Sequence, residues 1–430
     1  MASIRRRGNS FQIRVSLGYD AKGNKLEANT TFRPDLLTPK GNKKSDKTLE
    51  KEAADYARDF EKEVKSGERV TGDKITFAQY YEEWKIKYAK DNLEATTIEG
   101  YNIQIKKVMK YLGHLKMASI YPMTIQDLYQ KLQDDGASAA TIRKMHNILS
   151  GLFKAARKWR IVKKNPCEDV FQPKAKYNVE NINCWTLEQT QTFLELIKKP
   201  LPIKYKDRKR KSKSEGFYEV KGYVEYKSLS SQFIIMFEIL IFCGLRRGEL
   251  IALEWNDFNS SEKYLDINKS TAFLKNKMID KDTKGHRSRK VPLPGFLVDE
   301  LLALKKSQKE YMMAIGDQWV GKRNGSQKIF IQDNGKQMYL STPYNKFKSV
   351  INMCNQAITQ EDRKLPQITL HGLRHTNATL LISENTDVRT VSSLLGHQQT
   401  STTINIYAHS LRKNEEDAIT ALGNLLNKNA

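Results

Sequence analysis

The chain has 430 residues, of which 39% are hydrophobic, and a formal charge of +24. This length predicts two or three domains, and the hydrophobic fraction excludes a wholly disordered chain. So large a charge favours a polyanionic binding partner over a merely solvated basic surface. The sequence shows no long apolar run, no signal-peptide core and no lipidation motif, which favours nucleic acid over a membrane as the partner, and we expect a cytoplasmic location.

Residues 1–70 are predicted to form a small domain of their own. Alternating apolar runs at 11–17 and 26–32, separated by turn residues, indicate strands, and the apolar spacing over 49–66 indicates a helix. A three-stranded sheet with this helix behind it could place a basic face in a DNA groove, although a soluble hairpin cap has the same pattern. The candidate DNA contacts in this domain are Arg5, Arg6, Arg7 and Arg14.

Residues 71–175 are predicted to form a helical domain after a linker at 66–74. Four amphipathic segments are recognisable, and Ser138 is a suitable N-cap for the last of them. That last helix has basic residues outside its apolar stripe, which fits either a solvated bundle face or a DNA clamp. The candidate DNA contacts here are Arg143, Lys144, Arg157 and Lys158.

Residues 176–430 are predicted to form the last domain, after a second linker at 165–183. A helix capped by Thr186 opens it. Residues 198–213 then contain nine basic residues and one acidic residue, which indicates an inserted surface loop. This loop could contact DNA, act as a localisation patch or simply be solvated.

The segment GLRRGEL follows a strongly apolar helix that is predicted to stop at Gly244. Arg246 comes just after this glycine, where its surroundings could hold the guanidinium and aim it at an oxyanion. The same residues would also suit an ordinary corner between two helices.

The segment from 265 to 294 is predicted to form strands, with a turn from Thr283 to His286 and a final strand ending at Val291-Pro292. Lys284 lies at the tip of this turn. A lysine at the tip of a turn is usually exposed to solvent and has no specific function. If the turn enters a groove of the substrate, however, the lysine ammonium could protonate a leaving oxygen.

The segment LHGLRHT is predicted to open a helix with His371 and Arg374 one turn apart on one face. His371 and His375 have the spacing of a metal-binding pair, but the segment lacks the glutamate of HExxH, and Arg374 between them would repel a cation. The four cysteines lie far apart without a CxxC pair, which indicates reduced thiols. We therefore expect no metal and no other cofactor.

A further helix is predicted to end at Gly396, with His397 just beyond it. The segment STTINIYAH is then predicted to begin another helix and to present Tyr407. A tyrosine in a helix usually packs against neighbouring side chains and takes no part in chemistry. However, two arginines, a lysine, two histidines and a tyrosine on a basic chain are together the groups that phosphoryl transfer on DNA needs.

In these four segments the sequence resembles the tyrosine recombinases, especially the integrases of phages and conjugative transposons. The boxes occur in the family's order over nearly the whole chain: GLRRGEL, TKGHRSRKVPLP, LHGLRHT and LLGHQQTSTTINIYAH. The resemblance implies a multidomain fold, mostly α with small β-sheets, ending in a mixed α/β catalytic domain. It implies the catalytic residues Arg246, Lys284, His371, Arg374 and His397, with Tyr407 as the nucleophile.

The resemblance also implies partners. The domain at 1–70 would bind arm-type DNA sites, the domain at 71–175 would bind core sites, and a C-terminal helix near 419–426 would dock on a neighbouring protomer. We expect a homotetramer on double-stranded DNA in a bacterial cell, with an excisionase and a host DNA-bending protein as possible partners. The alternatives are a related recombinase for inversion or resolution, and an inactive DNA-binding relative.

Overall fold

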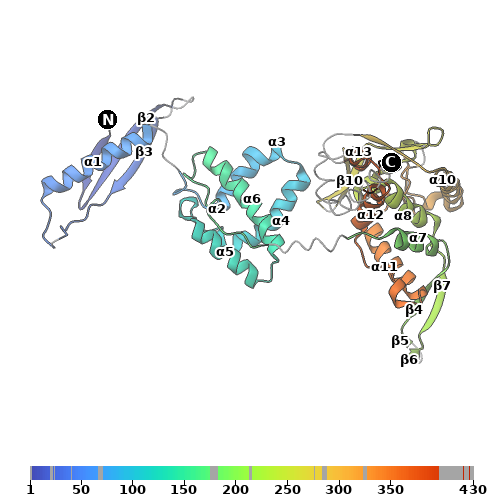
Figure 1. The fold of residues 1–430 in the computed structure, drawn as a ribbon. Helices are drawn as coiled ribbons and strands as arrows, with labels where there is room; N and C mark the ends of the chain where they lie inside the picture. Colours follow the sequence, from blue (N-terminus) through green and yellow to red (C-terminus); the bar gives the residue numbers. More distant parts are fainter. Residues whose placement is uncertain are drawn as a thin grey trace. The chain divides into compact units, whose positions relative to one another are not determined.

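The computed structural model describes residues 2–19, 23, 25–39, 41–65, 71–174, 183–212, 216–275, 277–282, 288–322, 327–396, 420 and 426, with the backbone alone at 208–212 and 216–218. The chain divides into two compact units, Met1–Tyr177 and Asn178–Ala430. Helices dominate and the sheets are small (Figure 1), which confirms the predicted fold class. The boundary near residue 70 stays a prediction. In the described part of the chain, no helix is long and apolar enough to cross a membrane.

The first unit begins with an antiparallel sheet of β1 (Ser3–Arg7), β2 (Ser10–Tyr19) and β3 (Lys25–Phe32) in that order. Alternation along β2 buries Ile13 and Val15 on one face. Helix α1 (Asp46–Lys65) covers this face with Ala57, Phe60 and Val64. The helix begins three residues before the predicted start, because its polar first turn carries no apolar periodicity.

The rest of the first unit contains a helical bundle. Its first helix is continuous through α2 (Phe77–Trp84), the π-helical turn η1 (Lys85–Ala89) and α3 (Lys90–Asn92). The other bundle helices are α4 (Ala95–Leu112), α5 (Pro122–Asp134) and α6 (Ala139–Lys158), with the 3-10 turn η2 (Met117–Ser119) between α4 and α5. Ser138 caps α6 by accepting from the Thr141 N–H, as predicted. Aromatic and aliphatic side chains from all these helices share one core.

The helices of the second unit surround a larger core. They are α7 (Leu187–Leu196), α8 (Ser231–Cys243), α9 (Arg247–Ala252), α10 (Gly295–Ile315), α11 (Thr342–Ala357), α12 (Leu370–Ser383) and α13 (Val388–Leu395). Single 3-10 turns are η3 (Trp255–Asp257), η4 (Gly316–Gln318) and η5 (Glu361–Arg363). Helix α8 is apolar on nearly every side and lies at the centre of this core, in contact with α10 and α12.

The strands that precede α10 include the predicted last strand. Strand β12 (Arg289–Pro292) ends at Pro292, as predicted, and pairs with β9 (Tyr264–Ile267), which also pairs with β8 (Phe258–Asn259). Strand β10 (Lys269–Leu274) pairs with β11 (Lys277–Asp282) around Lys275, whose φ is 47°. The sequence analysis did not predict this hairpin, because no glycine or proline marks its turn. The predicted turn at Thr283 to His286 lies outside the described residues and stays a prediction.

The basic insertion forms strands, so the predicted loop was wrong. Strand β4 (Leu201–Tyr205) pairs with β7 (Tyr223–Lys227), and β5 (Arg208–Ser212) pairs with β6 (Gly216–Val220). Together they form an arm, residues 201–227, that projects from the helices of its unit (Figure 1). Strands β6 and β7 are rich in aromatic residues, and the Tyr205 and Tyr223 rings stack across the β4–β7 pair at 4.6 Å.

Candidate active site

The first part of the site is the corner between α8 and α9. Helix α8 ends at Gly244, as predicted, in the left-handed conformation with φ 60°. A Cβ at this position would lie 2.6 Å from Leu395 Cδ2 and 2.9 Å from Asn377 Oδ1. Glycine therefore allows the corner to approach both α12 and α13, and it places Arg246 at the N-cap of α9.

The Arg246 side chain is held at both sides of its guanidinium. Its Nη1 donates to Glu249 Oε1 at 2.7 Å, and its Nη2 donates to the carbonyl of Gly396 at 3.0 Å. Glu249 Oε2 also accepts from the Arg246 backbone N–H at 3.0 Å. Because about a third of the Arg246 side chain remains exposed, the guanidinium can still meet an anion from solvent.

Arg374 lies deeper, with 2% of its surface exposed. It extends from α12, and its Nη1 and Nη2 donate to the carbonyls of Gly244 and Leu395 at 2.7 Å and 2.6 Å. Carbonyls at helix C-termini have no partner within their own helix, and a cation there also interacts favourably with the helix dipole. Arg374 thus joins the ends of α8 and α13.

Arg289 is a residue that the sequence analysis did not single out. It extends from β12, donates from Nε to the Leu394 carbonyl at 2.8 Å, and forms an ion pair between Nη2 and Glu249 Oε2 at 2.7 Å. Glu249 is buried, which opposes its ionisation, but Arg289 and Arg246 outweigh this effect and lower the pKa of Glu249 to about 2. Glu249 is therefore an anion that links two arginines.

His371 lies at the start of α12, near Arg246 and Arg374. Its side chain is exposed, and its ring stands edge-to-face with His375 at 4.8 Å between centroids. Desolvation by neighbouring atoms, with the charges of His375, Arg374 and Arg246, lowers the pKa of His371 to about 4. The imidazole is neutral at pH 7, and a neutral imidazole can accept a proton.

A pocket of about 300 Å³ opens beside His371. Among its lining residues are Arg247, Tyr344 and Thr369, and Thr369 caps α12 by accepting from the Gly372 N–H. A cation, two hydroxyl groups and an imidazole around an open hollow can bind a phosphate with hydrogen bonds and charge.

The structure therefore brings together three of the six predicted catalytic residues, Arg246, His371 and Arg374. Lys284, His397 and Tyr407 lie outside the described residues. The described chain stops two residues before Lys284, where β11 ends at Asp282, and one residue before His397, at Gly396. The φ of 66° at Gly396 gives the left-handed helix stop that the sequence predicted.

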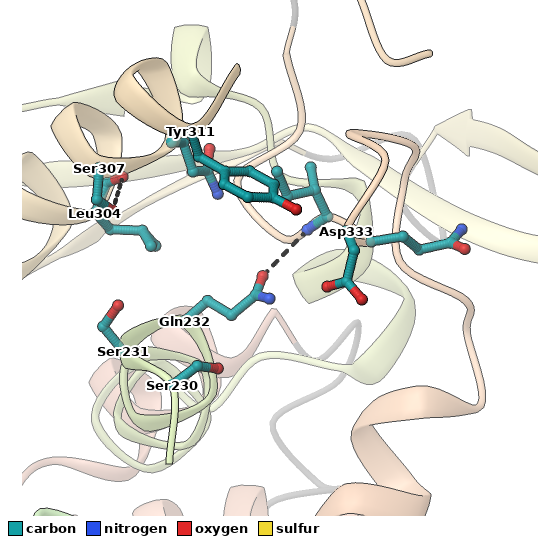
Figure 2. Close-up of a pocket in the computed structure, with 10 residues that line it drawn as sticks. Ser230, Ser231, Gln232, Leu304, Ser307, Tyr311 and Asp333 are labelled. Atoms are coloured by element: carbon teal, nitrogen blue, oxygen red, sulfur yellow. Dashed lines mark hydrogen bonds between the residues drawn. The ribbon is translucent and has the colours of Figure 1, made fainter. Parts of the chain in front are cut away.

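Another pocket, of about 160 Å³, lies between the start of α8 and α10 (Figure 2). Ser230, Gln232 and Tyr311 line it, and the Gln232 side chain accepts from the Ile331 N–H at 3.4 Å. Asp333 brings a carboxylate to the same pocket, and its lining has no cation. The Asp333 charge would repel a phosphate, so this pocket does not suit DNA chemistry.

Metal binding has no support in the described residues, among which no three His, Cys, Asp or Glu side chains form a group that could hold an ion. The His371–His375 pair stands next to Arg374, and desolvation followed by the positive charge of Arg374 lowers the pKa of both histidines. The same charge would oppose a bound cation.

The predicted DNA contacts of the first unit differ in how they are held. Arg5, Arg7 and Arg14 are exposed on the sheet face opposite to α1, whereas Arg6 points to the α1 side, where its Nη2 lies 2.7 Å from Asp46 Oδ1. On α6, Arg143, Lys144, Arg157 and Lys158 are exposed, and Arg157 forms an ion pair with Glu168 at 3.4 Å. DNA contact at these positions stays a prediction.

Comparison with known proteins gives consistent results. Residues 219–414 match the phage integrase family, and residues 76–133 match the N-terminal SAM-like domain of phage integrases. The chain is 25% identical to a tyrosine recombinase XerC-like protein of Caldanaerobacter subterraneus subsp. tengcongensis, over 87% of this chain and 90% of that protein. It is also 25% identical to the ICEBs1 integrase of Bacillus subtilis, over 97% of both chains.

The fold is similar to a solved structure as well. The Tn1549 transposon integrase in complex with a circular intermediate DNA superposes with a TM-score of 0.60 at 18% identity, over 80% of this chain and 99% of that one. At this identity, the likeness concerns the fold.

Proposed function

The chain belongs to the phage integrase family and is a tyrosine recombinase, an enzyme that breaks and rejoins DNA, and we propose that Tyr407 is its nucleophile. The observation that carries the proposal is that Arg246 and Arg374 both donate to carbonyls at the end of α13, while His371 lies close enough to both arginines for their charges to lower its pKa. From that end the chain continues directly to His397, and Tyr407 follows ten residues later.

In the proposed reaction, the Tyr407 hydroxyl oxygen attacks a scissile phosphorus. The bond from phosphorus to the 5′-oxygen breaks, which leaves a 3′-phosphotyrosine and a free 5′-hydroxyl. Because the phosphotyrosine conserves the bond energy, the 5′-hydroxyl of another strand can reverse the step without ATP. No metal is needed, since arginines supply the positive charge.

The remaining roles follow from the chemistry of each group. Arg246 and Arg374 stabilise the charge on the non-bridging oxygens in the transition state. His371, which is neutral at pH 7, accepts the Tyr407 proton, and Lys284 protonates the leaving 5′-oxygen. His397 donates a hydrogen bond to a non-bridging oxygen.

The biological reaction that we propose is integration and excision of a mobile element. Exchange of four strands requires one tyrosine for each strand, hence a homotetramer on two double-stranded DNA sites. Residues 1–70 would bind arm-type sites and residues 71–175 core-type sites, with an excisionase and a host DNA-bending protein as accessory partners. The enzyme would act in the bacterial cytoplasm, on the nucleoid when bound to DNA.

The proposal is tested with a DNA substrate nicked next to the cleavage position, from which the leaving fragment diffuses away. Wild-type protein should accumulate a covalent protein–DNA adduct in EDTA, and Tyr407→Phe should form none. Tyr311→Phe, which removes a hydroxyl at the pocket in Figure 2, is the matched control and should react as the wild type does. An adduct formed by Tyr407→Phe would refute the assignment.

A further inference from the structure

The end of α13 is held by three arginines from three different elements. The successive carbonyls of Leu394, Leu395 and Gly396 accept from Arg289, Arg374 and Arg246, respectively. Two of these arginines belong to the proposed catalytic set, whereas Arg289 does not. We propose that Arg289 is a positioning residue, which orients Arg246 through Glu249 and fixes the point from which the chain leaves towards His397 and Tyr407. This inference rests on the proposed function.

Arg289 has the geometry of a rigid connector. Besides its bond to the Leu394 carbonyl, it directs Nη1 and Nη2 to Glu249 Oε1 and Oε2 at 3.3 Å and 2.7 Å. This fork-to-carboxylate pairing restricts both groups more than a single ion pair does. The Arg289 backbone is also fixed, because Arg289 pairs with Ile267 of β9, and only 12% of its side chain is exposed.

Gly396 shows how closely Arg289 approaches the end of α13. A Cβ at Gly396 would lie 2.9 Å from Arg289 Nη1 and 3.2 Å from its Cζ, and the backbone φ is +66°. The guanidinium thus fills the space next to the last described residue before His397. Displacement of Arg289 would remove the side chain that packs against the backbone turn at Gly396.

Glu249 transmits the effect to Arg246. Its buried carboxylate is shared between Arg289 and Arg246. Without Arg289, the anion would retain Arg246 as its only charged partner among the described residues. The Arg246 guanidinium would then be drawn towards Glu249 and would be less available to a phosphate.

Arg289 also stands at the end of the segment that contains Lys284, five positions earlier in the sequence. One side chain therefore connects the strand that follows Lys284 with the helix that precedes Tyr407. Misplacement of reacting groups by about 1 Å can cost 10²-fold in rate, so a connector at this position should affect cleavage more than DNA binding.

The test compares cleavage of two nicked substrates by Arg289→Ala, Arg289→Lys and the control Lys290→Ala. Lys290 is the neighbour of Arg289 on β12, but its Nζ lies over the Tyr264 ring at 4.3 Å, away from Glu249. One substrate carries an ordinary scissile phosphate and the other a methylphosphonate, which lacks the charged oxygen that Arg246 is proposed to meet.

We expect Arg289→Ala to slow cleavage of the ordinary substrate about 10²-fold, with DNA affinity within about twofold of wild type. Arg289→Lys, which keeps the charge without the fork, should slow it about 10-fold. Both losses should shrink at least threefold on the methylphosphonate, as should the loss of Arg246→Ala. Lys290→Ala should match wild type on both substrates.

Equal losses on the two substrates would show that Arg289 does not act through Arg246 and would overturn that part of the proposal. Wild-type cleavage by Arg289→Ala would overturn both parts. If Arg289→Ala does not fold, the substrate ratio of Arg289→Lys decides in the same way. Absence of an adduct with wild-type protein would instead refute the proposed function, so the two failures are distinguishable.

Discussion

The second unit holds positive charge in two contrasting ways. At the candidate active site, Arg246, Arg289 and Arg374 are each bound to a carbonyl at the end of α13. In the arm, the basic residues lie on strands that project from the helices, and Lys204 and Lys206 are exposed. The site arginines cannot move without breaking several hydrogen bonds, whereas the exposed lysines of the arm face solvent.

This difference indicates two separate uses of charge. Exposed cations raise the association rate and affinity for a polyanion, and their effect declines with salt. Cations held by the protein in a fixed place stabilise charge that develops in a transition state, because they need not reorganise when it forms. Loss of a site arginine should therefore affect the rate of cleavage, and loss of arm charge should affect DNA binding.

The largest effect should come from Arg374→Lys. A lysine cannot donate to the Gly244 and Leu395 carbonyls as a fork does, and its ammonium would not lie where the guanidinium lies. We expect adduct formation to slow about 10³-fold at saturating DNA, with affinity within about threefold of wild type. The exposed Arg389 of α13 provides the control Arg389→Lys, which should react at the wild-type rate. If Arg374→Lys lost more DNA affinity than cleavage rate, the result would contradict the assignment of the site arginines to the cleavage step.

Asn377→Ala tests whether the fixed geometry depends on uncharged partners as well. The buried Asn377 Nδ2 donates to the carbonyls of Ile241 and Phe242 at the end of α8, at 2.8 Å and 3.1 Å. Loss of this group leaves both carbonyls short of a partner, and the free energy of unfolding should fall by about 2 kcal/mol. Chemical denaturation measures it. Asn352→Ala, at an exposed position bonded to Gln367, should change it by less than about 0.5 kcal/mol.

Parts of the site could be predicted because they carry local signals. Gly244 and Gly396 mark helix ends by a backbone conformation that favours glycine, and both are left-handed in the structure. The resemblance also selected Arg246, His371 and Arg374, which lie together. Lys284, His397 and Tyr407 stay predictions, since they lie outside the described residues.

The connections between those parts could not be predicted. Arg289 reaches a carbonyl 105 positions away, and Asn377 reaches one 136 positions away. Such contacts depend on how whole elements pack, and no spacing in the sequence encodes them. The arm was missed for a different reason. The basic composition of 198–213 indicated a loop, whereas the strands that pair with this segment, β6 and β7, lie after it at 216–227.

Neutralising the arm should have a smaller effect, of another kind. In the triple variant Arg208→Gln, Lys209→Gln and Arg210→Gln, we expect DNA affinity to fall about 10-fold at low salt. If each residue meets one phosphate, the slope of log K against log salt should decrease in magnitude by about 0.9 for each. Cleavage at saturating DNA should stay within about twofold of wild type. A loss of cleavage rate equal to the loss of affinity would contradict the separation of roles.

The matched control removes the same charge from α10 with Lys305→Gln, Lys306→Gln and Lys309→Gln. If the arm contacts DNA directly, the α10 variant should have a salt slope closer to wild type. Equal slopes in the two triple variants would mean that net charge alone, rather than the arm, determines affinity.

The smallest effect should be the pH dependence of stability that His371 produces. Its folded-state pKa of about 4 lies below the ordinary value of 6.5, so the unfolded chain binds more protons between these two values. The free energy of unfolding should therefore fall as the pH decreases from about 6.5 to about 4. The full shift would correspond to roughly 3 kcal/mol, but because the side chain is exposed to screening solvent we expect about 1 kcal/mol.

His371→Gln should reduce this loss, and NMR titration of the imidazole in the free protein should give the pKa directly. This pKa tests the difference between the site arginines and the arm, because after desolvation the charges of Arg374 and Arg246 contribute to lowering the pKa of His371. Arg246→Gln should therefore move the pKa of His371 upwards, whereas the triple variant of the arm should leave it unchanged. A pKa at or above 6.5 in the wild type would show that the site arginines do not act on the imidazole, and it would leave His371 largely protonated at mildly acidic pH, where it could not serve as a base.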